Sequence, residues 1–328
     1  MLIGAASLTP AQTSAQEPFT MDMSLYIQPQ FVSVDPDDAK SEGDFLVRRA
    51  RVSVRGNAYE DFTYLLQIDV AGSSARLIDA VVSRPINSNL TISAGQAKAP
   101  FGRQQLTSDT GLQFVDRGIL DPRFNPARQP GVWVSGGVGD GEIQYSAGVF
   151  NGDGINKAND DGDYLKAARV VWTPLGAFPL EEGALDFPES PRLALGAGVL
   201  STKFNPADPF DAERLGLEGA FKVGGFSAVS EYVHERLNSP TRGRRRMNAW
   251  YVQSGFVVRP GYEAALRYGS ISPSVADAIT PDLTEKGVAL SRYFRGQDAK
   301  IQADFLRIES DVLTPSVGQV RVQVQLRL

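Results

Sequence analysis

Apolar and polar residues alternate with a period of two along most of the chain, from about residue 22 to the last residue. The final stretch has apolar side chains at every second position: Val320, Val322, Val324, Leu326 and Leu328. A helix would spread such residues around its whole circumference, whereas a strand gathers them on one face. The pattern therefore predicts an all-β chain.

The alternating stretches predict sixteen strands, most of them about ten residues long. They are expected at residues 22–33, 44–56, 61–70, 75–84, 90–97, 131–137, 142–151, 165–173, 192–201, 213–223, 226–235, 247–258, 262–270, 285–294, 299–308 and 319–328. Such strands match the length of a tilted strand that crosses a bilayer, whereas strands of globular proteins average about five or six residues. No stretch approaches the roughly 20 apolar residues of a transmembrane helix.

The connections between these strands alternate in length. Short turns are expected at residues 57–60, 85–89, 138–141, 224–225, 259–261 and 295–298, and most of the other connections are long. Outer-membrane barrels have this asymmetry, with short periplasmic turns and longer extracellular loops. The short 71–74 loop and the long 174–191 turn break the pattern.

An even number of strands closes a sheet without free edges, which a bilayer requires because it cannot hydrogen-bond exposed backbone groups. We therefore predict a transmembrane antiparallel β-barrel of about 16 strands with both termini in the periplasm. A barrel of this size encloses an aqueous channel rather than a core packed with side chains.

The N-terminal residues 1–16 contain a short apolar stretch, Leu2 to Leu8, followed by small and polar residues. This order is typical of the end of a secretory signal peptide, although the positively charged region that normally precedes it is missing. We interpret residues 1–16 as a signal-peptide remnant, with a disordered terminus as the alternative. No linker divides residues 17–328, which are expected to form a single barrel domain.

Composition excludes several classes of function. The chain has 328 residues and a net charge of −5, which argues against a nucleic-acid partner. There is no Cys, and the only His is His234, so thiolate sites and triads that depend on histidine are excluded. No nucleophile elbow, phosphate-binding loop or dinucleotide fingerprint occurs. We predict that the protein is not an enzyme and has no cofactor and no metal site.

The second predicted strand carries a ladder of arginines. Arg49, Arg51 and Arg55 share one face of this strand, and the opposite face is apolar. A charge on the lipid face near the middle of the bilayer costs about 2–4 kcal/mol, so the arginines are expected to point into the lumen. They form either a guide for anions or salt bridges with Asp69 and Asp79, which fall on the polar faces of the next strands. The two roles are compatible.

The connection at 98–130 is the longest in the chain, and a long loop without strand patterning is usually functional. Its apolar content indicates a packed loop that folds inward and narrows the pore with Lys98 and Arg103. The alternative is a loop that lies over the mouth of the barrel.

The alternation also assigns residues to the two faces of the wall. Those expected to point into the lumen are Arg49, Arg51, Arg55, Asp69, Asp79, Glu218, Glu231, Glu263 and Arg267. Those expected to face lipid are Val52, Tyr64, Leu66, Leu217, Trp250 and Leu266. The basic run at 242–246 is expected in an extracellular loop, either fully solvated or in contact with lipid phosphates or other anions.

Several short motifs occur in order over nearly the whole chain: Arg48-Arg49-Ala50-Arg51, Asp79-Ala80, Gly95-Gln96, Lys98-x-Pro100-Phe101-Gly102, Gly131-Val132, Ala147-Gly148-Val149-Phe150-Asn151-Gly152, Glu231-Tyr232, Arg267-Tyr268 and Arg321-x-Gln323. In this set the chain resembles the phosphate-selective porins O and P, which are sixteen-stranded outer-membrane channels. The resemblance implies that the third loop folds into the lumen and that basic residues line the route of the anion. Arg49, Arg51, Lys98 and Arg103 are the positions it carries over.

Two features depart from the family pattern. Lysine is scarce, and the C-terminal residue is Leu328 rather than the aromatic residue typical of outer-membrane barrels. The thin basic lining argues against a dedicated phosphate channel.

We expect a porin of the bacterial outer membrane for passive diffusion of small hydrophilic solutes, with a preference for anions and with phosphate or polyphosphate as candidate solutes. Its expected partners are small anions or other hydrophilic solutes, outer-membrane lipid and, as a candidate assembly, a homotrimer. The main alternative is a structural or anchoring barrel with an occluded pore. A soluble glycan-binding protein is less favoured, because the aromatic residues lie on the expected lipid face.

Overall fold

The computed structural model describes residues 19–37, 40–59, 61–204, 210–241, 243–276, 281–312 and 316–328. The signal-peptide remnant predicted at 1–16 lies outside the described residues. Sixteen strands run in chain order: β1 (Asp22–Pro36), β2 (Glu42–Ala58), β3 (Phe62–Asp69), β4 (Arg76–Asn87), β5 (Leu90–Lys98), β6 (Arg128–Val138), β7 (Ile143–Phe150), β8 (Leu165–Trp172), β9 (Arg192–Phe204), β10 (Phe210–Val223), β11 (Phe226–Ser239), β12 (Gly243–Arg259), β13 (Tyr262–Pro273), β14 (Leu283–Arg295), β15 (Ala299–Glu309) and β16 (Val317–Arg327).

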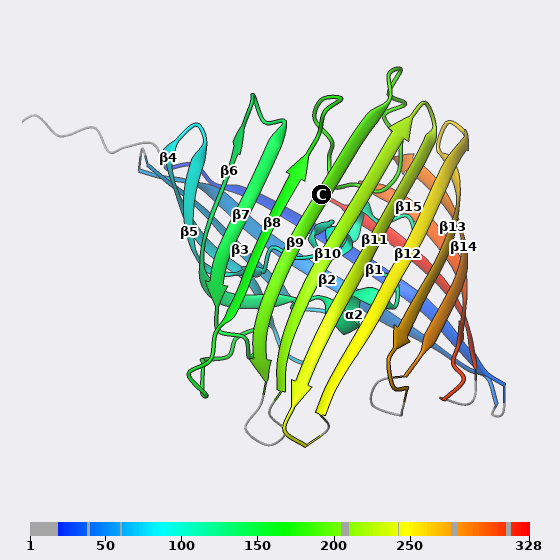
Figure 1. Ribbon diagram of the computed structural model, residues 1–328. Helices are drawn as coiled ribbons and strands as arrows, with labels where there is room; N and C mark the ends of the chain where they lie inside the picture. The colour runs from blue at the N-terminus through cyan, green and yellow to red at the C-terminus, as the bar shows by residue number, and fades with distance from the viewer. Residues whose placement is uncertain are drawn as a thin grey trace, which may run out of the picture.

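Every strand pairs with its neighbours in the chain, and β1 pairs antiparallel with β16, so the sheet closes on itself. Phe31 of β1 lies opposite Val322 of β16 in this closing pair. The prediction of a closed barrel of sixteen antiparallel strands is confirmed (Figure 1). The last described residue lies at the upper end of Figure 1, and the connections at the opposite end are called the loop end below.

Within the residues that the structure describes, helical structure is confined to the connection between β5 and β6. It consists of α1 (Arg103–Leu106), the 3-10 turn η1 (Asp109–Gly111) and α2 (Leu120–Phe124). Among the residues that the structure describes, no helix is long and apolar enough to cross a membrane.

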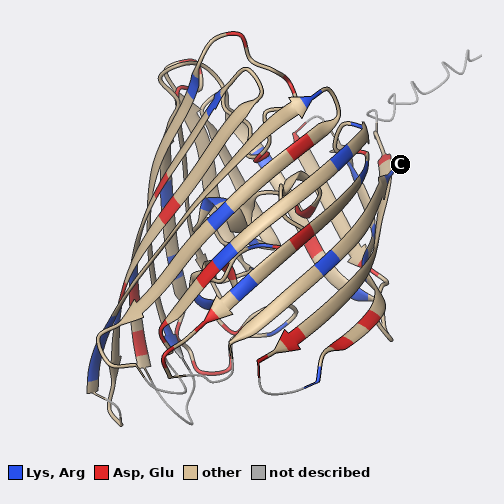
Figure 2. Cartoon of the chain, turned by 90° about the vertical axis from the view of Figure 1, so that its right-hand side faces the viewer, with Lys and Arg blue, Asp and Glu red and all other residues tan. Residues whose placement is uncertain are grey.

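The two faces of the wall differ as the alternation requires. Leu66, Leu217 and Leu266 lie on the outer face, with 40%, 49% and 60% of their surface exposed. Polar side chains such as Gln253 and Glu263 are buried on the inner face. Charged residues occur along the strands as well as in the connections (Figure 2).

A buried apolar cluster lies inside the barrel. Phe101 of the β5–β6 connection is completely buried there, together with Phe150 and Leu165 of the inner wall. Gly198 of β9 and Gly216 of β10 leave room for its ring, because a Cβ atom on either glycine would lie 3.1–3.3 Å from Phe101. The barrel interior is therefore partly packed rather than wholly open.

A β-bulge interrupts the pairing of β1 with β2. Gln28 lies opposite Arg49 but the next residue, Pro29, lies opposite Val47, so Arg48 is an extra residue on β2. Bulges re-aim side chains. Strict alternation would send Arg48 to the lipid face, whereas its guanidinium donates a hydrogen bond of 3.0 Å from Nε to Asp116 of the β5–β6 connection.

Candidate functional site

The connection between β5 and β6, residues 99–127, contacts strands on the far side of the ring. Val115 donates its backbone N–H to Asp304 of β15 at 2.9 Å, and Ile119 donates to Glu285 of β14 at 3.1 Å. Lys300 of β15 donates from Nζ to the carbonyl of Leu112 at 2.9 Å. We call residues 99–127 the lumen loop, because these partners belong to the inner face of the wall opposite β5 and β6.

Glu231 of β11 holds the first helical turn of the lumen loop. Its carboxylate accepts hydrogen bonds from the backbone N–H groups of Arg103 and Gln104, both at 2.7 Å. The first N–H groups of a helix have no partner within the helix, and a carboxylate satisfies them well. An acidic residue on the wall thus fixes where the loop begins to turn.

A second segment enters the lumen from the connection between β8 and β9. Glu182 of this segment accepts hydrogen bonds from the backbone N–H of Gln113 at 2.9 Å and from Nε2 of Gln253 at 2.8 Å. Its own backbone N–H donates to Gly111 at 3.1 Å. Phe178 lies under the Arg103 guanidinium, 4.9 Å from ring centroid to Cζ. We call residues 173–191 the lumen turn.

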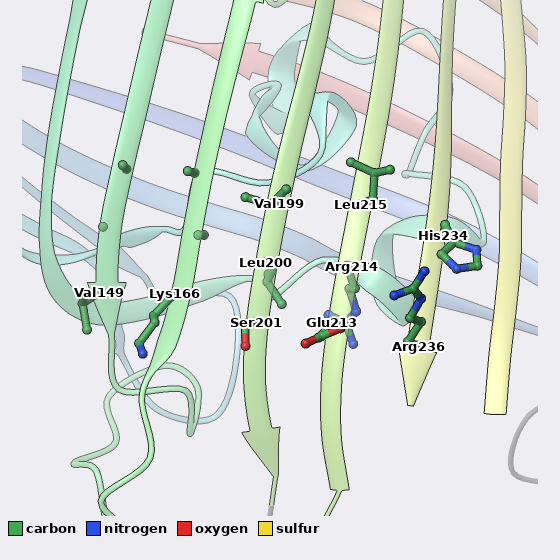
Figure 3. Close-up of a pocket in the computed structure, with 14 residues that line it drawn as sticks. Val149, Lys166, Val199, Leu200, Ser201, Glu213, Arg214, Leu215, His234 and Arg236 are labelled. Atoms are coloured by element: carbon green, nitrogen blue, oxygen red, sulfur yellow. The ribbon is translucent and has the colours of Figure 1, made fainter. Parts of the chain in front are cut away.

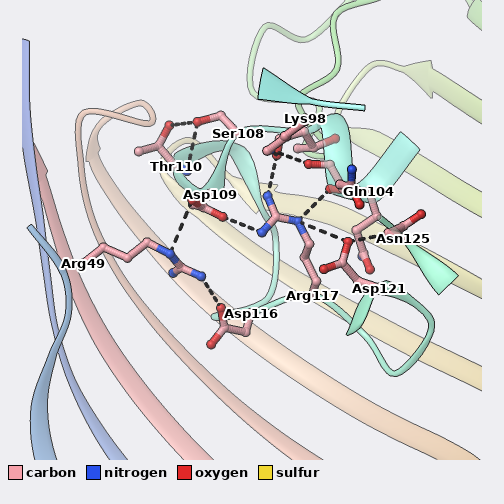
Figure 4. Close-up of polar contacts among 12 residues, drawn as sticks. Arg49, Lys98, Gln104, Ser108, Asp109, Thr110, Asp116, Arg117, Asp121 and Asn125 are labelled. Carbon is pink, nitrogen blue, oxygen red and sulfur yellow. Dashed lines mark hydrogen bonds and ion pairs between the residues drawn. The ribbon is translucent and has the colours of Figure 1, made fainter. Parts of the chain in front are cut away.

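The arginine ladder of β2 is paired with carboxylates from both the wall and the loop. Figure 4 shows Arg49 between Asp109 and Asp116 of the loop. Arg51 donates from Nε to Asp69 of β3 at 2.8 Å and from Nη1 to Asp109 of the lumen loop at 2.6 Å. Arg49 donates from Nη2 to Asp116 at 2.6 Å. Only 3% of Arg49 and 7% of Arg51 is exposed. These two guanidiniums therefore anchor the loop to the wall.

Asp109 is the centre of this polar network. It accepts ion pairs from Arg49 at 3.4 Å, from Arg51 and from Arg117 of the lumen loop itself. Burial alone would raise the pKa of the Asp109 carboxyl, but the positive charges of Arg49, Arg117 and Arg51 hold it well below its usual range. The carboxylate stays ionised at neutral pH. Lys98 donates from Nζ to the loop carbonyls of Gln105 and Thr107.

Comparison with known proteins fits this architecture. The sequence model of the family described as phosphate-selective porin O and P matches residues 22–194, which is more than half of the chain. The chain belongs to this family. The predicted family, the porin character and the location in the bacterial outer membrane are thereby confirmed.

Individual relatives of this porin are distant in sequence. Porin O of Pseudomonas aeruginosa is 23% identical over 323 residues, covering 84% of this chain and 70% of the relative. The solved structure of an anion-selective porin from Comamonas acidovorans is similar with a TM-score of 0.72 at 13% identity, covering 95% of this chain and 100% of that one. The trimer form of OmpT from Vibrio cholerae has a TM-score of 0.65 at 11% identity, with coverage of 95% and 100%.

The remaining site residues predicted for this porin do not join the ladder. Asp79 forms a salt bridge of 2.8 Å with Arg128 at the start of β6. Arg103 is 1% exposed and donates to the carbonyl of Pro179 in the lumen turn at 2.8 Å, so it is packed between the two inward segments. Arg55 is exposed.

Arg55 lines an open compartment of about 550 Å³ near the chain termini. Asp22 lies directly opposite it on β1, and both residues line this compartment together with inward-facing side chains such as Leu65 and Ser83. The compartment therefore lies beside the inner face of β1–β6.

Sequence reasoning missed Arg48, Asp109, Asp116 and the lumen turn. Strict alternation places Arg48 on the lipid face, and the cost of a charge there is a signal that could have indicated a bulge. The long 174–191 turn stood out as an exception to the loop pattern without a reason. Its Phe178, which is buried in the structure, would have been costly in a solvated turn and could have indicated packing.

One carboxylate of the lumen loop pairs with two arginines of the wall. Asp116 binds both Arg48, at 3.0 Å, and Arg49, at 2.6 Å. Next to β2, the salt-bridge network joins the basic residues Arg48, Arg49, Arg51 and Arg117 to the acidic residues Asp69, Asp109, Asp116 and Asp121. Of its guanidiniums, Arg48 is the most accessible, with 42% of its side chain exposed.

Proposed function

We propose that this porin conducts small hydrophilic solutes passively with a modest preference for anions, and that phosphate or polyphosphate is a candidate solute. The observation that carries the proposal is the sharing of Asp116 by Arg48 and Arg49, which leaves the accessible Arg48 guanidinium incompletely neutralised. The proposed roles differ within the ladder. Arg49 and Arg51 hold the lumen loop, whereas Arg48 meets the solute.

Local charge decides selectivity in such a site. The net charge of −5 is spread along the whole chain, and exposed charges are screened beyond about 8 Å at physiological salt. A guanidinium beside a packed loop acts in a medium of lower dielectric constant and is screened much less. An anion would therefore meet a site of moderate affinity, which permits both entry and release.

The relatives support this proposal without extending it to one solute. The description of the Comamonas acidovorans structure names an anion-selective porin, and the family description names phosphate. A single accessible guanidinium that shares its carboxylate with a second arginine favours general anion preference over tight phosphate binding. We include no catalytic role in the proposal.

A second candidate function is a structural barrel with an occluded pore. The lumen turn favours it, because Glu182 and Phe178 bind the lumen loop and fill part of the interior from the side of the chain termini. Conductance in a planar bilayer separates the two candidates. The porin gives stepwise currents with an anion-selective reversal potential, whereas an occluded barrel inserts without steps.

The proposal also covers assembly and processing. We infer a homotrimer as the assembly, which the trimer form of OmpT supports by analogy. We further infer that residues 17–328 form one barrel domain and that residues 1–16 are the remnant of a removed leader. Crosslinking of the purified protein in detergent and N-terminal sequencing of the exported form test these two points.

A further inference from the structure

The outer face of the wall carries a row of polar side chains at the loop end. Lys166, Ser201, Glu213, Arg236 and Arg246 lie opposite one another in register on β8 to β12. A lipid-facing wall is expected to be apolar at the depth of the acyl chains, so this row marks the level of the head groups.

Three arginines in this region outnumber the two acidic side chains beside them, Asp211 and Glu213. Arg236 of β11 lies directly opposite Arg246 of β12, and Arg244 follows two residues away on the same face of β12. Like charges directly opposite on neighbouring strands destabilise a sheet. Within the described part of the chain, no ion pair is formed by any of the three guanidiniums. They line one pocket of about 370 Å³ together with Asp211 and Glu213, so the pocket has three positive and two negative side chains.

An apolar groove of about 790 Å³ adjoins this pocket and shares Glu213 and Arg236 with it. Figure 3 shows Val199 and Leu215 along the groove, with Lys166 and Arg236 at the end nearer the loops. Ala168 of β8 lies opposite Val199, and its small side chain leaves the wall hollow. A long apolar chain fits such a groove better than a flat wall does.

The charged row and the apolar groove are spaced like the head group and the acyl chain of an amphiphile. Glu213 and Leu215 are two residues apart on β10 and point to the same side, so the charged row and the apolar groove are separated by about 7 Å along the strand. We propose that this surface binds one phosphorylated acyl lipid of the leaflet at the loop end. The lipid phosphate binds Arg236, Arg244 and Arg246, and an acyl chain lies in the groove.

A second groove on the outer face differs from the first in that its cations are paired. It has a volume of about 530 Å³ and is lined by Lys286 and Arg307. These two cations are already paired, Lys286 with Glu309 at 2.7 Å and Arg307 with Asp37 at 2.5 Å. A second copy of the chain would have to bring carboxylates to the first site, whereas one lipid supplies both the negative charge and the apolar chain.

The test is native mass spectrometry of the full chain in detergent with three probes: didecanoyl phosphatidic acid, didecanoyl phosphatidylcholine and inorganic phosphate. We expect one phosphatidic acid per barrel and about ten-fold weaker retention of phosphatidylcholine and phosphate. The variant R236Q/R244Q/R246Q should lose the bound lipid about ten-fold or more, because each guanidinium contributes a charge-assisted hydrogen bond. The control K286Q/R307Q should retain it.

A further variant distinguishes the contribution of the apolar groove to lipid binding from that of the arginines. Ala168→Leu fills the groove on the outer face without touching the lumen, and it should weaken phosphatidic acid binding while leaving channel conductance unchanged. Equal retention of phosphatidic acid by the triple arginine variant would overturn the proposal. So would equal binding of phosphatidylcholine, or of inorganic phosphate, by the wild type. A stable dimer or trimer mass that depends on the same arginines and excludes lipid would assign the surface to a second copy.

Discussion

Arg51 of β2 and Asp109 of the lumen loop form an ion pair with 2.6 Å between Nη1 and Oδ2, and both side chains are more than nine-tenths buried. The pair joins the wall to the loop that crosses the interior. Because Asp109 also binds Arg49 and Arg117, three guanidiniums depend on one carboxylate. Removing this carboxylate would take one partner from each guanidinium and leave Arg49 with Asp116 and Arg51 with Asp69, neither of which joins all three.

Asp109→Asn should therefore loosen the lumen loop. Breaking a buried ion pair by removing one partner costs about 3–5 kcal/mol, so thermal unfolding in detergent should occur at a clearly lower temperature. Single-channel recordings should show larger and noisier currents as the loop leaves its position. Asp61→Asn is the matched control, because Asp61 pairs with Arg84 on the surface, where a salt bridge contributes at most about 1 kcal/mol. Equal unfolding temperatures for the two variants would refute the anchoring role of Asp109.

The ionisation of Asp109 determines how its anchoring of the lumen loop depends on pH. The pKa of Asp109 is lower in the folded protein than its reference value of 3.8, so its contribution to stability is complete above that value and is lost as the pH falls through the folded pKa. The part of the loop's protection in hydrogen exchange that Asp109→Asn removes should therefore be lost in the wild type only well below pH 3.8. A loss of that part at pH 5 to 6 would contradict this assignment.

Glu182→Gln tests the lumen turn. The substitution removes the charge that Gln113 and Gln253 bind and leaves one buried donor poorly matched, at a cost of about 1–3 kcal/mol. The turn should then detach more readily and the open-channel conductance should increase. Glu181→Gln is the control, since Glu181 is exposed beside it. If both variants conduct like the wild type, the lumen turn does not restrict the pore.

The sixteen strands and the closed barrel were predictable from the sequence because a period of two is a local property. Each apolar face, such as Val320 to Leu328, is visible without knowledge of its neighbours. The pairing of Arg51 with Asp69 was also within reach, because both residues lie on polar faces of adjacent strands. Strand boundaries differed by a few residues, since pairing extends beyond the bilayer.

The interior was harder to predict because its contacts are not local. Asp109 is 58 residues from Arg51 in the sequence, and no periodicity indicates which loop carboxylate meets which arginine. Strict alternation would place Arg48 on the lipid face, and the bulge that changes its direction is not visible in the period of two. Arg103 matched the family motif but is packed against Phe178, a residue in a different connection. Such contacts depend on how both connections fold into the barrel, which the sequence pattern does not show.

Charge selectivity is the central claim, and the reversal potential across a planar bilayer under a potassium chloride gradient tests it most directly. The wild type should be modestly anion-selective. Arg48→Gln should shift the reversal potential toward zero or into the cation-selective range, because it removes the most accessible guanidinium of the network. Arg84→Gln, which removes an arginine of the outer face paired with Asp61, should leave the potential unchanged. A cation-selective wild type, or an Arg48→Gln potential equal to that of the wild type, would contradict the account.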